Sequence, residues 1–600
     1  MTQAAAASRR SEDRAADEAG PWVLDDLYLG TDDPAVAADL DRSASEAEAF
    51  QARYAGHLAE LSGDELAAAI ETYERIIERL HRVMSFAQLH FAADMSAPDR
   101  GRFLQDMQER CNDISTRTLF FTLELNRLDD ATVRAQLQAP AAKRWESWIN
   151  DSRMYRPHQL ADDMEQLLHE RSVTGAGAWT RLFDQTLSEM RFPIDGEEMT
   201  LAGTLNRLDN PEAEVRRTAA KALGEGLRGR VGVFSLIINT LAKDKEIDDR
   251  WRHYPQPVSY RNLSNKVESE VVDAMVEAIR SSFADLSHRY YRLKARWFGR
   301  DTLDYWDRNA PLPGDDNRRY SWGEARAIVL DSFGGFDPRM AEIAGRFFDN
   351  PWIDAPPRPG KDSGAFCHPV IPSVHPYVLM NFYGRPRDVT TLAHELGHAV
   401  HQVLAGGQGT LMADTPLTLA ETASVFGEML VFRRLLDQET GAGRQRLLAG
   451  KVENMLNTVV RQTAFHTFEQ RVHQERRAGE LPVERLGELW LDVQRESLGP
   501  VFRFEDEYSY FWAYIPHFVH SPFYVYAYAF GDCLVNSLYQ VFGEGHPGFQ
   551  EKYFAALRAG GTLRHREVLA PFGLDATDPA FWRRGLAVIS GFIDELEAAA

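Results

Sequence analysis

The run His394-Glu395-Leu396-Gly397-His398 combines two imidazoles and a carboxylate at a spacing suited to metal-dependent hydrolysis. In a helix, residues four apart lie one turn above each other, so His394 and His398 can each direct a ring nitrogen to one metal ion. Glu395 lies beside them, where a carboxylate can accept a proton from water. Catalytic zinc has three protein ligands and a fourth position for water. The run therefore predicts a zinc site that needs one more ligand.

The third ligand is predicted at Glu421, in the run Glu421-Thr422-Ala423-Ser424. Residues 418–430 are predicted to form a second amphipathic helix, with Glu421, Ser424 and Glu428 on its polar face. Carboxylates on an otherwise apolar helix are costly to bury unless they are paired or bound to a metal, which favours Glu421 as the ligand. Glu428 is a candidate acceptor for the second nitrogen of a ligand imidazole, and the alternative is an ordinary surface carboxylate.

The helix that carries both histidines is clearly signalled. Asp388 follows Pro386 and is expected to cap its amino end, and Gly406-Gly407 is expected to end it. Apolar residues recur between these points at helical spacing, namely at Val389, Leu392, Leu396, Val400 and Leu404. The metal-binding face is therefore expected to lie alongside a buried face.

An H-E-x-G-H helix followed by E-x-x-S on a second helix resembles the thimet oligopeptidase superfamily of zinc metallopeptidases. Further landmarks are similar to the oligoendopeptidase F branch and extend over nearly the whole chain; they lie at residues 22–28, 363–367, 376–382, 516–518 and 523–528. This resemblance implies a mainly α-helical, two-lobed fold with a deep central channel and a small β-sheet beside the zinc helix. Such a channel would admit short unstructured peptides and exclude folded proteins.

The resemblance also implies a His and Tyr pair that holds the substrate carbonyl and its developing oxyanion. His517 matches the family's histidine. The tyrosine spacing, Phe-Tyr-x-Tyr-x-Tyr, departs from the Tyr-Tyr-x-Tyr run of the thimet branch, so three phenols remain candidates. Helical geometry places Tyr524 and Tyr528 on one face and Tyr526 on another, which favours the first two. The neighbouring aromatic residues are expected to pack in the core: Phe511, Trp512, Phe518 and Phe523.

The predicted function is zinc-dependent hydrolysis of internal bonds in short oligopeptides. One zinc ion per chain, held by His394, His398 and Glu421, would lower the pKa of a water to about 7, and Glu395 would act as general base. One alternative is a broader, thermolysin-like protease, which the absence of a secretion signal disfavours. Another is a helical peptide-binding protein without turnover, which the complete set of ligands disfavours.

Composition narrows the list of partners. The chain has 600 residues, 44% of them hydrophobic, and a net charge of -22, which argues against nucleic acid and anionic membrane surfaces. No stretch approaches the roughly 18 consecutive apolar residues of a membrane span. The three cysteines are widely separated, so a disulfide framework is not expected and a cytoplasmic location is predicted.

Four regions are expected: a disordered tail (1–20), a helical region (21–190), a helical connecting region (191–300) and a catalytic region (301–600). Ser62 and Glu65 predict a capping box, and Asp195-Gly196 predicts a hairpin turn. Long helices are expected from Asn210, across 267–298 and across 521–542. Residues 364–382 predict the small sheet, which either supports the zinc helix or binds peptide by strand addition.

Overall fold

The computed structural model describes residues 19–172, 174–314 and 318–599. The chain divides into two compact units, and each unit is assembled from three separate stretches of sequence. Unit 1 comprises Met1–Arg156, Asn317–Gln438 and Gly545–Phe572, and unit 2 comprises Pro157–Asp316, Glu439–Glu544 and Gly573–Ala600. The stretch Pro157–Asp316 of unit 2 includes both positions, near residues 190 and 300, where regional boundaries were expected, and the four regions stay a prediction. Of the tail expected at 1–20, residues 1–18 lie outside the described residues.

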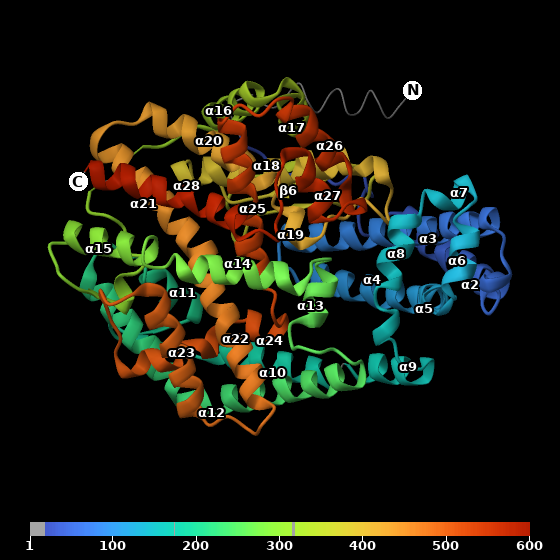
Figure 1. Cartoon of the computed structure of the whole chain (residues 1–600), viewed down its shortest axis with the longest axis horizontal. Helices are drawn as coiled ribbons and strands as arrows, with labels where there is room; N and C mark the ends of the chain where they lie inside the picture. Colours follow the sequence, from blue (N-terminus) through green and yellow to red (C-terminus); the bar gives the residue numbers. More distant parts are fainter. Residues whose placement is uncertain (1–18, 173, 315–317, 600) are drawn as a thin grey trace. The chain divides into compact units, whose positions relative to one another are not determined.

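Both units are almost entirely helical, which confirms the predicted fold class (Figure 1). The helices and strands of unit 1 are α2 (Pro34–Tyr54), α3 (Gly63–Ala92), α4 (Pro98–Thr116), α5 (Leu119–Arg127), α6 (Asp130–Gln136), α7 (Pro140–Lys143), α8 (Glu146–Arg153), α16 (Trp322–Phe336), α17 (Pro338–Asp349), β4 (Ile353–Asp354), β5 (Phe366–His368), β6 (Tyr377–Leu379), α18 (Pro386–Ala405), α19 (Leu417–Ala420), α20 (Ser424–Gln438), α26 (Phe549–Arg558) and α27 (His565–Leu569).

Those of unit 2 are α9 (Asp162–Arg171), α10 (Ala176–Glu189), β1 (Phe192–Ile194), β2 (Glu197–Met199), α11 (Leu201–Arg207), α12 (Ala213–Trp251), α13 (Ser259–Ser264), α14 (Ser269–Ser281), α15 (Ser287–Trp297), β3 (Leu303–Asp304), α21 (Gly441–Leu456), α22 (Gln462–Arg476), α23 (Val483–Leu498), β7 (Phe502–Arg503), α24 (His517–His520), α25 (Tyr526–Gly543) and α28 (Pro579–Ala598). Among the described helices, none is both long enough and apolar enough to cross a membrane.

The sheet of unit 1 lies beside α18, as predicted. Its central strand β6 is fully buried, pairs in parallel with β4 and pairs antiparallel with β5, where Phe366 lies opposite Leu379. Trp22 packs against this sheet, with its ring centroid 6.4 Å from Phe366 and 5.9 Å from Tyr377. The first described residues of the chain therefore cover the sheet that flanks the zinc helix.

Two local predictions are confirmed. In front of α3, the Ser62 backbone N–H donates to the Glu65 carboxylate at 2.8 Å, and the Glu65 N–H donates to the Ser62 hydroxyl at 3.3 Å. This is the predicted capping box. Between β1 and β2, Asp195 and Gly196 have φ values of 55° and 85°, the left-handed conformation that a two-residue hairpin turn requires.

Two predicted helix boundaries are wrong. The helix expected from Asn210 begins only at Ala213, because the Asn210 side chain accepts the N–H of Glu212 at 2.8 Å and forms a turn in front of α12. The single helix expected across 267–298 is two helices, α14 and α15. They are separated at Leu286, whose backbone (φ -108°, ψ -92°) lies outside the helical region.

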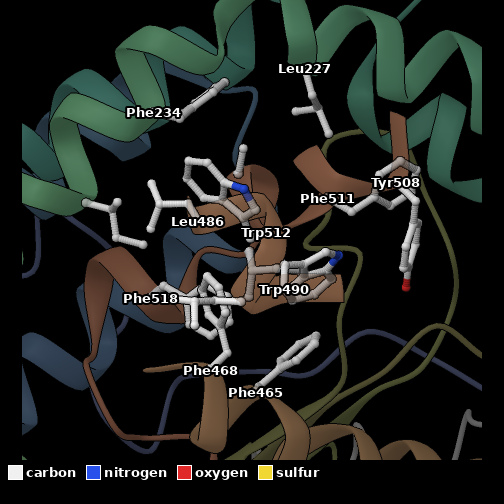
Figure 2. Packing of buried hydrophobic residues seen from close by; sticks show 14 of the residues in the cluster. Leu227, Phe234, Phe465, Phe468, Leu486, Trp490, Tyr508, Phe511, Trp512 and Phe518 are labelled. Atoms are coloured by element: carbon white, nitrogen blue, oxygen red, sulfur yellow. The ribbon is translucent and has the colours of Figure 1, made fainter. Parts of the chain in front are cut away.

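The core of unit 2 joins α12, α22 and α23 to the aromatic segment that precedes α24. Figure 2 shows Trp490 and Trp512 among Phe465, Phe468 and Phe518 in this cluster. The four aromatic residues predicted to be core are all buried, which confirms that part of the sequence interpretation: Phe511, Trp512, Phe518 and Phe523. Phe518 directly follows His517, so the core fixes the backbone that carries this imidazole.

Candidate active site

Helix α18 presents His394, Glu395 and His398. It begins at Pro386, and Asp388 caps its amino end as expected, from the third position of the helix. The Asp388 carboxylate lies in the first turn and accepts the N–H groups of Tyr383 at 2.8 Å and Arg385 at 3.0 Å. Proline suits this first position because its fixed φ is helical and its missing N–H needs no partner there. The helix ends at Ala405, before Gly406, as predicted.

The second helix, expected as one piece over 418–430, is interrupted. Helix α19 ends at Ala420 and α20 begins at Ser424, so Glu421 lies in a turn between them. The hydroxyl of Thr422 donates to the backbone carbonyl of Leu419 at 2.6 Å, and that of Ser424 donates to the carbonyl of Glu421 at 3.2 Å. Side chains of this type compete with helical hydrogen bonds. The turn carries the Glu421 carboxylate, whose Oε2 also accepts the Ser424 hydroxyl, toward α18.

The three predicted metal ligands converge. Glu421 Oε2 lies 3.4 Å from His394 Nε2 and 3.5 Å from His398 Nε2, and one ligand atom from each residue lies within 4.8 Å of the other two. Within the part of the chain that the structure describes, no other set of three His, Cys, Asp or Glu side chains is grouped in this way. Two imidazoles and one carboxylate are a donor set that catalytic zinc sites use, so the residues fit a zinc ion.

The close approach of α18 and α20 depends on glycine. These two helices lie side by side in Figure 1. A Cβ at Gly397 would overlap the carbonyl oxygen of Ala423 and lie 2.6 Å from the Cα of Ser424. On α20, a Cβ at Gly427 would lie 3.4 Å from the carbonyl oxygen of Ala393 on α18 and 2.9 Å from the ring of Phe333 on α16. The glycine within the H-E-x-G-H motif therefore permits the helix packing that places Glu421 beside the two histidines.

Each of the two predicted ligand imidazoles has a further hydrogen-bond partner. His394 Nδ1 lies 3.2 Å from Glu428 Oε2, so the Nδ1–H donates to this carboxylate and Nε2 keeps its lone pair for a metal. His398 is hydrogen-bonded with the backbone of Ala420. The sequence left two roles for Glu428, an acceptor for a ligand imidazole or an ordinary surface carboxylate. In the structure Glu428 is the hydrogen-bond partner of His394.

The site carries more negative than positive charge. Burial lowers the pKa of His394, but the hydrogen bond with Glu428 and the charges of Glu421 and Glu395 outweigh it and raise the pKa to about 9. Burial opposes ionisation of Glu421, yet the two histidines and the Ser424 hydroxyl hold its pKa below the usual value. For His398, burial dominates and lowers the pKa to about 4. Three carboxylates around two imidazoles favour a bound cation.

Glu395 lies next to the three predicted ligands and is not one of them. It is 5% exposed, and burial raises its pKa to about 7, with the charge of His394 opposing this and those of Glu421 and Glu428 adding to it. A hydrogen bond with the backbone of Cys367, on strand β5, lowers the pKa somewhat. A carboxyl group with a pKa near neutrality can both accept and donate a proton at pH 7.

A cavity of about 640 Å³ within unit 1 adjoins the ligands. His398, His401 and Gln402 of α18 form one wall, and residues 368–376 between β5 and β6 form another. Its volume lies in the range of small-ligand sites. Of the three predicted ligands, His398 lines this cavity.

The other predicted site residues are grouped in unit 2. His517 Nε2 lies 3.4 Å from the Tyr528 hydroxyl oxygen, within hydrogen-bond distance. The ring centroid of Tyr524 lies 6.0 Å from that of His517 and 5.3 Å from that of Tyr528. Burial, with a smaller effect from Arg461, holds the pKa of His517 below its usual value, so the imidazole is neutral at pH 7. Tyr526 is fully buried, and its oxygen accepts the Asn265 amide at 2.8 Å.

The helix expected across 521–542 begins only at Tyr526. Phe523 has φ 59°, which no helix accommodates, and Pro522 in front of it has no N–H to continue a helical ladder. Tyr524 therefore lies outside α25, and helical periodicity does not set its direction. The turn still places its ring beside that of Tyr528. Neither Asn265 nor the Cys367 backbone was expected at a site. Asn265 lies 261 residues from Tyr526, and such a distant partner leaves no signal in local spacing.

Comparison with known proteins agrees with this geometry. Two family models match, one described as Peptidase family M3 at residues 339–588 and one described as Oligopeptidase F at residues 124–192. Residues 339–588 thus resemble peptidase family M3. The matches indicate a metalloendopeptidase, and zinc is expected for family M3, in agreement with the resemblance to the oligoendopeptidase F branch.

The similarity to curated oligopeptidases spans nearly the whole chain. The chain is 26% identical to oligopeptidase PepF of Bacillus subtilis over 98% of its own length and 88% of that protein. It is 25% identical to group B oligopeptidase PepB of Streptococcus agalactiae, with 91% of each chain covered. The crystal structure of oligoendopeptidase-F from Enterococcus faecium matches with a TM-score of 0.71 and 21% identity, covering 94% of this chain and 97% of that one. This last match supports the fold.

Proposed function

We propose that the protein is a zinc-dependent oligoendopeptidase that hydrolyses internal peptide bonds of short, unstructured peptides. His394, His398 and Glu421 would hold one zinc ion per chain, and Glu395 would be the general base. The convergence of the three ligand atoms within 4.8 Å, beside a buried glutamate, is the observation that carries this proposal. A zinc ion bound there supplies a Lewis acid that polarises the scissile carbonyl and makes a water acidic.

Glu395 moves the proton. Its carboxylate accepts a proton from the attacking water and then donates it to the nitrogen of the departing amine. The pKa near 7 supports both roles, because the carboxyl group gives up and regains the proton at similar cost at neutral pH. The Cys367 backbone supports the orientation of the carboxylate, and Glu428 fixes the tautomer of His394.

We assign stabilisation of the developing oxyanion to His517 and to Tyr524 or Tyr528. The family resemblance and the mutual contact of these three side chains within unit 2 support the assignment. A neutral imidazole and a phenol donate hydrogen bonds without carrying a full charge, and donors aimed at developing charge are among the largest contributions to catalysis. Tyr526 is excluded from this role because its hydroxyl is buried against Asn265.

Turnover of quenched fluorescent peptides of graded length, with cleavage sites mapped by mass spectrometry, tests the proposal. Wild type is expected to cleave short peptides at internal bonds, to lose activity to a chelator and to regain it with zinc. Glu395→Gln is expected to keep its zinc and lose turnover by about 1,000-fold or more. Asp437→Asn, the same change at an exposed carboxylate on α20, is the matched control.

Each competing function gives a different result in this assay. A broader, thermolysin-like protease would degrade folded proteins as readily as peptides. A peptide-binding protein without turnover would retain peptides and cleave none. Normal turnover in a zinc-loaded Glu395→Gln variant would show that another group is the base. The cytoplasmic location stays a prediction.

A further inference from the structure

A buried glutamate in unit 2 has no part in the chemistry described above. Glu469 lies on α22, is 2% exposed, and accepts the backbone N–H of Phe523 at 2.8 Å through Oε1. The rings of His466 and His473, on the same helix, pack against Phe523 at centroid distances of 5.9 Å and 4.9 Å. Three side chains of α22 therefore hold one residue of the segment between α24 and α25.

The conformation of Phe523 explains why it needs a fixed partner. Its φ of 59° lies in the left-handed region, which is unfavourable for a large L-residue and persists only where surrounding contacts enforce it. Phe523 precedes α25, so its N–H takes no part in the hydrogen bonds of that helix, and a buried N–H must find another acceptor. Glu469 supplies this acceptor.

The same turn is held from a second direction. Arg261, which lies on α13, donates through Nε to the carbonyl oxygen of Pro522 at 3.3 Å. Its guanidinium also lies 5.7 Å from the ring centroid of Tyr524. The single peptide group between Pro522 and Phe523 is thus held at its carbonyl oxygen and at its N–H by two elements, α13 and α22, that are distant in sequence.

The turn connects the two parts of the His and Tyr group. His517 opens α24, Tyr524 directly follows Phe523, and Tyr528 lies in the first turn of α25. A change in the backbone at Phe523 would therefore alter the direction of both phenols relative to the imidazole. We propose that Glu469 is a positioning residue that sets Tyr524 and Tyr528 against His517 by holding the backbone of Phe523. This inference rests on the role proposed above for the tyrosines.

The protonation of Glu469 identifies the conservative variant. Burial raises its pKa to about 8, with the charges of Arg261 and Lys245 acting in the opposite direction, so the group is uncharged at pH 7. Glutamine has nearly the same shape as an uncharged glutamic acid and keeps a carbonyl oxygen that can accept the Phe523 N–H. Leucine has a similar volume and no acceptor.

The experiment compares Glu469→Gln and Glu469→Leu in the peptide assay, on zinc-loaded full-length protein. Glu469→Gln is expected to stay within about twofold of wild type, and Glu469→Leu is expected to lower kcat by about 10- to 100-fold with KM within about threefold. Zinc content should be unchanged in both. Glu484→Leu, at an exposed position of α23, is the matched control and is expected to behave as wild type. Wild-type kcat in Glu469→Leu would overturn the proposal.

A double-mutant cycle separates positioning from general damage. In a protein that already carries Tyr524→Phe and Tyr528→Phe, Glu469→Leu is expected to lower kcat by less than about twofold, because the groups it positions no longer donate. An equal loss in both backgrounds would mean that Glu469 acts on stability or on something other than the tyrosines, and would overturn the proposal.

Amide hydrogen exchange distinguishes failure of this inference from failure of the proposed function. The peptide covering residues 521–528 is expected to exchange faster in Glu469→Leu and at the wild-type rate in Glu469→Gln. If the two tyrosine substitutions leave turnover intact while exchange behaves as expected, the assigned role of the tyrosines fails and the backbone contact stands. If exchange in Glu469→Leu equals that of wild type, the positioning contact itself is refuted.

Discussion

Replacement of Glu428 by alanine should weaken zinc binding without removing the site. The Glu428 Oε2 lies 3.2 Å from His394 Nδ1, and the two side chains are only 19% and 26% exposed, so the hydrogen bond is partly shielded from water. Its loss leaves the imidazole free to rotate and to change tautomer. Partners of this type contribute about 10- to 100-fold in metal affinity, which corresponds to about 1.4–2.7 kcal/mol at 1.36 kcal/mol per factor of ten.

The assay is competition for zinc between the metal-free protein and a chromophoric chelator. Glu428→Ala is expected to fall within the 10- to 100-fold range given above, and Glu428→Gln between it and wild type, because the amide oxygen can still accept from Nδ1–H. Glu421→Ala removes a ligand and should bind far more weakly than either. Asp437→Ala, at an exposed carboxylate of the same helix, is the control. Wild-type affinity in Glu428→Ala, or a loss equal to that of Glu421→Ala, would refute the assignment.

Three further predictions follow from other contacts. Replacing the acting phenol, Tyr524 or Tyr528, by phenylalanine should lower kcat by about 100-fold or more, with zinc content and KM little changed, whereas Tyr526→Phe should have a much smaller effect. Steady-state kinetics on the three single variants tests this. A loss confined to Tyr526→Phe would contradict the geometry. Gly397→Ala should cost about 1–3 kcal/mol of stability and reduce bound zinc, because the alanine methyl group pushes α18 away from α20. Thermal unfolding and metal analysis measure these effects. A variant that is as stable as wild type and binds a full complement of zinc would contradict the prediction. Because the pKa of Glu469 is raised to about 8, the folded protein keeps a proton between about pH 5 and 8 that the unfolded chain has lost. As pH rises through this range, wild type should lose stability relative to Glu469→Gln by up to about 1.4 kcal/mol per pH unit. Melting temperatures of the two proteins that change in parallel would contradict this.

Features that depend on neighbouring residues could be predicted from the sequence. The pair His394 and His398 needs only an α-helix to share one face, and the apolar repeat around them predicts that helix. The capping box at Ser62 and the turn at Asp195 likewise require only residues close in sequence. Glu421 could be named as the third ligand because its carboxylate falls within an apolar segment.

Tertiary structure decided the features in which local preference was overruled. The sequence predicts one helix through Glu421, but the structure has a turn there, whose Thr422 carbonyl accepts the hydroxyl of the distant Tyr553 at 2.8 Å and whose Glu421 carboxylate lies beside the histidines of α18. The pKa values of Glu395 and His394 depend on burial and on charges brought from another helix, which no local spacing contains.

The sequence by itself determined the chemistry of the metal site, because helical periodicity fixes which residues four positions apart share a face. Only the tertiary structure decided which tyrosines accompany His517. Phe523 keeps a left-handed conformation while Glu469 and Arg261, far away in sequence, bind the N–H and the carbonyl oxygen of the peptide group between Pro522 and Phe523, and Asn265 holds the Tyr526 hydroxyl in the interior. Buried polar groups need hydrogen-bond partners, and packing of the core supplies these partners from distant parts of the chain. The residues next to a buried group in sequence therefore do not identify its partner.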